Sequence, residues 1–263
     1  MKLLVTFKVI PDLDQMLAGD YSADETMMVN TSFVRTMLNC FDESGLEFGL
    51  RLSDEAESLG LFVEKTALTV SGKQAELYLK TLTALKYEHT VHVDDEEWDL
   101  RFEPGQIAEI IYQYLRDFPQ DYIIMGNQAV PGNNSLTPRI LSGKMRIPLL
   151  ENVIDLHLNQ DGIIEATTEE ENGIYIQKVE APAIFSIGNA VISKLRVPTL
   201  KERLASKGKE SRHIKIKNRI TEKKQLISLT YVDRNRTGKI LEGENVLLQF
   251  IKEYQEIKGK ESL

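Results

Sequence analysis

Apolar positions along the first half of the chain alternate between two spacings, which predicts strands and helices in turn. Short apolar or β-branched runs predict strands at residues 3–9, 66–71, 90–93 and 121–126. Apolar residues three and four positions apart predict helices at residues 42–59, at 74–87, and from Pro104 onward. Strands that alternate with helices of this length are typical of βαβ units. We therefore expect an α/β fold, a doubly wound parallel sheet with helices on both faces.

The pattern changes after Pro148. Four short strands are predicted at residues 149–158, 162–169, 174–179 and 183–187, with turn residues between the first three. We expect them to form a β-meander appended to the α/β core. A basic connector follows from Lys201, and then an amphipathic helix at residues 243–258, whose apolar stripe is Val246, Leu247, Phe250, Ile251 and Tyr254.

Two segments of different character follow from these patterns. Residues 1–200 are predicted to form the α/β nucleotide-binding domain with its meander, and residues 201–263 a C-terminal arm. A lone amphipathic helix on a long connector needs another surface to cover its apolar stripe. The arm is therefore expected to wrap around a partner.

Composition and charge exclude several classes of protein. The 263 residues are 42% hydrophobic, as in ordinary globular proteins. Cys40 is the single cysteine, which excludes an internal disulfide and fits a reducing compartment. The four histidines have no metal-like spacing, so no metal site is expected. No apolar run reaches about 18 residues, and the first residues lack the features of a signal peptide. We expect a cytoplasmic protein without membrane insertion.

The net charge of −8 is unevenly distributed. Residues 1–200 carry a net charge of −15 and residues 201–263 carry +7. The acidic body argues against nucleic acid as a ligand, because that binding depends on neutralising phosphates. The basic excess lies within residues 201–224. This segment is either a solvated connector or a docking segment for an acidic surface.

Two loops are candidates for ligand binding, because ligands of open α/β sheets bind beyond the carboxyl ends of the strands. They are residues 7–12, after the first strand, and residues 126–135, after the fourth. The second loop carries glycines and precedes a helix predicted at residues 135–142, an arrangement that favours phosphate. A plain helix-capping turn is the alternative. Asn39 is likewise either the N-cap of a capping box with Asp42 or a ligand residue. No nucleophile–base or paired-carboxylate motif is present, so no catalytic residue is expected.

Four stretches of the chain resemble the beta subunit of electron transfer flavoproteins. They are residues 2–12 (KLLVTFKVIPD), 39–47 (NCFDESGLE), 126–134 (GNQAVPGNN) and 196–201 (RVPTLK). The resemblance implies an adenine-nucleotide-hydrolase-like fold without hydrolase activity. It also implies a heterodimer with an alpha subunit that carries the redox-active FAD. The beta subunit itself would hold AMP or a second FAD, and the heterodimer would dock a dehydrogenase.

The resemblance also assigns roles to individual residues. It places Val9, Asn39 and Ser71 near the adenosine, and it places the following residues around the phosphates: Gly126, Gln128, Gly132, Asn133, Asn134 and Ser135. It implies that residues 189–194 recognise the partner dehydrogenase through Asn189, Val191, Ile192 and Lys194, with Ile192 at the place of an exposed leucine. The sequence departs from the family pattern at Pro131 and Asn133, where aspartates are usual. This change leaves a less negative pocket.

The function expected from the sequence is electron carriage by the beta subunit of such a flavoprotein, from a dehydrogenase to an acceptor. The alternative is a nucleotide-binding regulatory or stress-type module of the same fold that acts as a homodimer. The predicted arm favours the first, since a stand-alone module has no use for it. A hydrolase of adenylated substrates is disfavoured, because the phosphate loop lacks the Ser-Gly-Gly-x-Asp-Ser type of sequence.

Overall fold

The computed structural model describes residues 1–94, 99–215, 226–230, 238, 240–243 and 245–260. The chain divides into two compact units. The first comprises residues 1–15 and 31–225, and the second comprises residues 16–30 and 226–263. Each unit is described by itself.

The first unit is built on one mixed sheet, in which the described residues form nine strands in the order β11-β5-β4-β1-β6-β10-β7-β8-β9. Neighbours from β11 to β7 pair in parallel, and β7, β8 and β9 pair antiparallel. The bounds in sheet order are β11 (Arg212–Lys215), β5 (His89–Asp94), β4 (Glu64–Ser71), β1 (Lys2–Thr6), β6 (Tyr122–Gly126), β10 (Ala183–Ile187), β7 (Leu149–Leu158), β8 (Ile164–Glu170) and β9 (Gly173–Val179). A separate antiparallel pair joins β2 (Val9–Pro11) to β3 (Thr36–Leu38).

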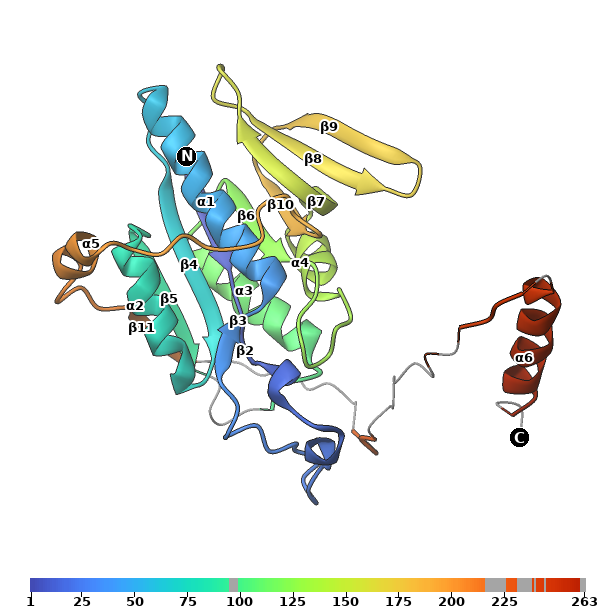
Figure 1. The fold of residues 1–263 in the computed structure, drawn as a ribbon. Helices are drawn as coiled ribbons and strands as arrows, with labels where there is room; N and C mark the ends of the chain where they lie inside the picture. The colour runs from blue at the N-terminus through green and yellow to red at the C-terminus, as the bar shows by residue number, and fades with distance from the viewer. Residues whose placement is uncertain (95–98, 216–225, 231–237, 239, 244, 261–263) are drawn as a thin grey trace. The chain divides into compact units, whose positions relative to one another are not determined.

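Helices cover both faces of the parallel part (Figure 1). The larger core cluster contains residues of α1 (Cys40–Ser58) and α2 (Glu76–Ala84), and the other contains residues of α3 (Pro104–Asp117) and α4 (Thr137–Met145). Side chains of β1 alternate between them, with Leu3 and Val5 in the first cluster and Leu4 in the second. All three are fully buried, as expected for a central strand covered on both faces. The prediction of an α/β fold with a mostly parallel sheet and helices on both faces is confirmed.

The strand at residues 183–187 lies elsewhere than in the expected meander. β10 is parallel to both of its neighbours and separates β7 from β6. All five of its residues are buried, which is the pattern of a central strand. A short apolar run identifies a strand but not its neighbours, so the sequence pattern did not distinguish the two positions. β7, β8 and β9 extend the same sheet at one edge.

Part of the expected basic connector forms regular structure. Residues Leu200–Ala205 form α5, which begins with a capping box between Thr199 and Glu202. Residues Arg212–Lys215 form β11, the edge strand beside β5. Residues 216–224 of the connector lie outside the described residues.

The second unit contains α6 (Val246–Lys260), close to the helix predicted at residues 243–258. Its apolar stripe is exposed within the described residues, from Val246 at 37% to Leu247 at 71%. None of the described helices combines the length and the apolar character needed to span a membrane.

Candidate functional site

A cleft lies where β1 and β6, neighbours in the sheet, reach their carboxyl ends. The loop after β1, the loop after β6 and the first turn of α4 all contribute to its wall. Five of the residues assigned to a phosphate site line it, namely Gly126, Gln128, Asn133, Asn134 and Ser135. The cleft is partly open to solvent and has a volume of about 120 Å³, which leaves room for a small group such as a phosphate.

Asp42 joins the two loops of the cleft. It extends from the first turn of α1, and its two carboxylate oxygens accept backbone N–H groups from Lys8 and Gly126, both at 2.9 Å. Asp42 is 6% exposed. Burial raises its pKa to about 6, although hydrogen bonds from Lys8, Asn39 and Gly126 oppose the increase. Asp42 therefore sets the separation of the two loops and carries a proton more readily than an exposed aspartate.

The carboxylate of Asp42 explains the glycine at position 126. A Cβ atom built on Gly126 would overlap the Asp42 side chain. Glycine lets the end of β6 approach the first turn of α1, so that its N–H reaches the carboxylate. The cleft thus depends on close packing between the strand end and the helix.

Asn39 connects the same helix to the second loop. It occupies the N-cap of α1, but its side chain makes no capping bond and instead donates from Nδ2 to the Gln128 carbonyl at 2.9 Å. Of the two alternatives for Asn39, the N-cap position is confirmed, but the hydrogen bonds of a capping box with Asp42 are not formed. Asn39 is 4% exposed and lies outside the wall of the cleft. Its ligand role stays a prediction.

The backbone of the second loop makes an unusual series of turns. Gly132, Asn133 and Ser135 have φ values of +105°, +46° and +54°, in the left-handed region. Asn134 Oδ1 accepts the N–H of Leu136 at 3.0 Å. α4 then begins at Thr137, slightly later than predicted, and the side chain of its N-cap residue Leu136 makes no capping hydrogen bond. The first residues of α4, Thr137 and Pro138, line the cleft, so the positive end of the helix dipole lies there.

Two cationic residues also line the cleft, Lys8 and Arg101. Lys8 is close enough to Asp42 for its charge to lower the pKa of that carboxyl. Arg101 donates from Nε and Nη2 to the carboxylate of Asp99, both at 2.9 Å. The loop that contains Lys8 was predicted to bind a ligand, but Lys8 itself was not singled out. Arg101 was not predicted, since it belongs to the segment between β5 and α3 rather than to either expected loop.

Besides Asn39, three of the residues assigned to the nucleotide lie outside the wall of this cleft. Val9 is buried in β2, and Ser71 is buried at the end of β4, where its Oγ lies 3.2 Å from Thr69 Oγ1. A Cβ on Gly132 would meet the carbonyl oxygen of Arg101 at 3.1 Å and Asn134 Nδ2 at 3.4 Å. The structure therefore brings five of the expected phosphate-site residues together. The assignment of Val9, Asn39 and Ser71 to the adenosine stays a prediction.

The loop at residues 189–194 presents a different apolar residue from the expected one. Ile192 is half-buried and packs against the larger core cluster, whereas Val191 is 63% exposed. Asn189 and Lys194 are exposed. If this loop docks a partner, Val191 is the apolar side chain available to it.

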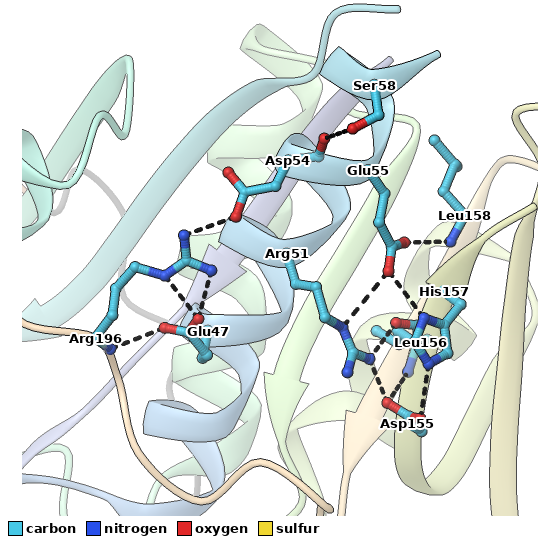
Figure 2. Close-up of polar contacts among 10 residues, drawn as sticks. All are labelled: Glu47, Arg51, Asp54, Glu55, Ser58, Asp155, Leu156, His157, Leu158 and Arg196. Carbon is cyan, nitrogen blue, oxygen red and sulfur yellow. Dashed lines mark hydrogen bonds and ion pairs between the residues drawn. The ribbon is translucent and has the colours of Figure 1, made fainter.

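Acidic residues of α1 fix the end of that loop (Figure 2). Leu195 N donates to Glu43 at 3.1 Å, and Arg196 N donates to Glu47 at 2.8 Å. The guanidinium of Arg196 also pairs with Glu47 and with Asp54, the latter at 2.7 Å. Because α1 also carries Asp42, one helix positions both the cleft and the 189–194 loop.

A second group of contacts joins α1 to β7 (Figure 2). Arg51 binds the carboxylate of Asp155, and Glu55 accepts the backbone N–H of Leu158 at 2.7 Å. His157 lies between Glu55 and Asp155, with ring nitrogens 2.8 and 3.0 Å from their carboxylate oxygens. These contacts hold the first strand of the antiparallel edge on the helix.

Comparison with known proteins gives consistent relatives. The family model described as "Electron transfer flavoprotein domain" matches residues 26–217. The chain is 25% identical to the Escherichia coli (strain K12) protein YgcR, named provisionally as an electron transfer flavoprotein subunit. That alignment covers 94% of this chain and 93% of YgcR. This chain is also 24% identical to the electron transfer flavoprotein subunit beta of Bacillus subtilis (strain 168). That alignment covers 87% of this chain and 91% of the Bacillus subtilis protein. A Saccharomyces cerevisiae protein named provisionally as subunit beta is 24% identical over 71% of this chain and 67% of its own length. The chain belongs to the electron transfer flavoprotein beta subunit family.

Proposed function

We propose that the chain is the beta subunit of an electron transfer flavoprotein, which carries electrons from a dehydrogenase to an acceptor as a heterodimer with an FAD-bearing alpha subunit. The observation that carries this proposal is the extent of the similarity. It covers nearly the whole chain and nearly the whole of relatives named as subunits of such flavoproteins. The sequence adds that no catalytic motif competes with this role. We also propose that the protein is located in the cytoplasm, a reducing compartment.

The cleft would hold an adenine nucleotide, AMP or a second FAD, by its phosphates. The chemistry of the wall supports this. It contains the uncharged amide side chains of Asn133 and Asn134, the hydroxyl of Ser135, and the cations Lys8 and Arg101. The helix terminus at Thr137 adds a partial positive charge. Asp42 also lines the wall, but its two carboxylate oxygens already accept backbone N–H groups from Lys8 and Gly126. The remaining residues therefore fit a phosphate group. Asn39, Val9 and Ser71 are proposed near the adenosine, and Gly132 near the phosphates.

The exposed stripe of α6 favours a heterodimer over the homodimeric regulatory module. Phe250 and Tyr254 stack at 6.1 Å between ring centroids, and both are more than half exposed. A large apolar surface of this kind marks an interaction site. We propose the alpha subunit as its partner, and a dehydrogenase as the partner of residues 189–194.

Calorimetric titration of the full chain with AMP, ADP and FAD tests the nucleotide site. Lys8→Gln removes a cation from the wall and leaves the backbone N–H that binds Asp42. It should weaken binding by about tenfold or more, because charge-assisted hydrogen bonds contribute about 1.5–3 kcal/mol. Lys2→Gln is the matched control, since Lys2 is exposed at the start of β1, at the opposite end of that strand from the loop that contains Lys8.

If the wild-type chain binds none of the three nucleotides, the loop after β6 is only a helix-capping turn and the nucleotide proposal is wrong. If Lys2→Gln weakens binding as much as Lys8→Gln, the cleft is not the binding site. Tight binding by an isolated chain that elutes as a homodimer would favour the regulatory module instead.

A further inference from the structure

Three side chains of metal-binding type meet on the face of the sheet that α2 covers. His92 belongs to β5, His213 belongs to β11, and Glu76 lies in the first turn of α2. The two histidines are direct partners in the parallel register of β5 and β11, so their side chains point to the same face. Glu76 Oε1 is 3.4 Å from His92 Nδ1 and 3.4 Å from His213 Nε2. The three ligand atoms all lie within 4.8 Å of one another.

His92 is buried in a way that leaves one ring nitrogen without a hydrogen bond. The residue is 3% exposed, and its Nε2 lies 2.6 Å from the carbonyl oxygen of Ser71. Since a carbonyl only accepts, Nε2 carries the hydrogen. In the neutral ring Nδ1 then carries a lone pair, and this buried atom has no hydrogen-bond partner. A lone pair facing a carboxylate oxygen at 3.4 Å is unfavourable unless a cation lies between them.

The arrangement has the features of a metal-binding histidine. Such a histidine usually donates its second ring nitrogen to a carbonyl or carboxylate, which fixes the tautomer and the ring orientation. The Ser71 carbonyl serves this role for His92.

The distances also fit. Zinc binds imidazole nitrogen and carboxylate oxygen at about 2.0–2.2 Å, and tetrahedral geometry then places ligand atoms about 3.3–3.6 Å apart. Two of the three pairs measure 3.4 Å.

We propose that Glu76, His92 and His213 form a binding site for Zn²⁺, with one position left for water. Two neutral imidazoles and one carboxylate are a common zinc ligand set. The ion would join α2, β5 and the edge strand β11. The histidine spacing predicted no metal site, because the three residues lie far apart in the sequence and only the strand register brings the histidines together.

A titration of the full, metal-free chain without an added histidine tag tests the site. Competition with a chromophoric chelator should show one equivalent of Zn²⁺ bound, with a dissociation constant below about 1 μM. Cobalt(II) should give the visible absorption bands of a tetrahedral or five-coordinate ion.

His213→Gln and Glu76→Gln should each weaken Zn²⁺ binding by more than about tenfold, because loss of even an outer-shell partner has an effect of that size. His213 is 59% exposed, so its replacement keeps the test valid even if a variant of buried His92 fails to fold. His89→Gln is the control. His89 lies on the opposite face of β5 and pairs with Glu64, so binding should be unchanged.

Three results would overturn the proposal. They are the absence of stoichiometric Zn²⁺ binding by the wild-type chain, binding that survives His213→Gln, and equal loss in the His89→Gln control. In the first case a proton on His92 would satisfy Glu76 in place of a metal. Each of these results leaves the nucleotide test at the cleft unaffected.

Discussion

Asp42 determines the shape of the cleft at the scale of single residues. Each of its oxygens binds the backbone of a different loop, so the side chain acts as a bridge between the ends of β1 and β6. Such a bridge needs two acceptors at fixed positions, which a carboxylate provides. Burial makes the charged form costly, and the proton equilibrium of this residue is therefore tied to folding.

The stability contributed by Asp42 should fall as the pH rises. Its pKa is raised by burial from 3.8 in the unfolded chain to about 6 in the fold. Between these values the folded state holds a proton that the unfolded chain has lost. The free energy of unfolding should therefore decrease from pH 4 to pH 7, by about 2–3 kcal/mol, and should level off above pH 7, where the folded state has also lost the proton. Urea denaturation of wild type and Asp42→Asn measures this as a difference, in which other titrating groups cancel. A difference that stays constant from pH 4 to pH 7 would contradict the raised pKa.

Gly126→Ala should destabilise the fold and weaken nucleotide binding together. The added methyl group would overlap the Asp42 carboxylate, so the strand end or the helix must move. We expect a loss of about 1–3 kcal/mol in the free energy of unfolding. Gly143→Ala is the matched control. Gly143 lies in α4 with nothing within 4 Å of its added Cβ, so alanine should leave stability unchanged or raise it by about 0.5–1 kcal/mol. If the two variants unfold at the same urea concentration, close packing at Gly126 is not required.

α1 organises several parts of the molecule at the scale of elements. One side of the helix holds residues 195–196 through Glu43, Glu47 and Asp54, and another holds β7 through Arg51 and Glu55 (Figure 2). Its first turn closes the cleft through Asp42. α6 differs from α1, because its apolar stripe is exposed within the described residues.

Deleting residues 226–263 should abolish association with the alpha subunit. The stripe of α6 is expected to lie in an interface of about 2,000 Å² or more. Size-exclusion chromatography of the co-expressed chains measures this directly. Phe250→Glu combined with Ile251→Glu should have the same effect, whereas Gln249→Glu on the same helix should not. Co-elution of the truncated chain with its partner would disprove the role of the arm.

The sequence predicted an element well where its position depends on neighbouring residues, and poorly where it depends on residues far away in the chain. The apolar spacing located β1, α1, α2 and α3 to within a few residues, because burial on one or two faces leaves a periodic pattern. The position of β10 was missed, since the sheet neighbours of a strand are set by distant residues. Asp42 and Arg101 were missed as site residues for the same reason. Their roles depend on loops that meet only in the folded sheet.

The whole molecule should acquire its redox function only as an assembly. We expect the isolated chain to show little flavin absorbance and poor electron transfer, because the proposal places the redox-active FAD on the alpha subunit. Co-expression with that subunit should give a robust flavin spectrum after purification. Absorbance spectroscopy and a dye-reduction assay with a dehydrogenase couple provide the measurement. Efficient turnover of such a couple by the isolated chain would contradict the proposed division of labour.

The position of β10 has a consequence for synthesis on the ribosome. β7, β8 and β9 are translated before β10, yet β10 separates them from β6 in the sheet. While residues 149–182 emerge, β6 and β7 each have an edge without its final neighbour. Such edges can pair with another nascent chain. They stay unpaired until β10 has been translated, because pairing between strands that are distant in the sequence forms late. The ion pair and the hydrogen bond between α1 and β7 can hold the antiparallel edge on the helix during this interval. Ribosome-bound chains that stop before residue 183 should therefore aggregate more readily than longer chains that include β10.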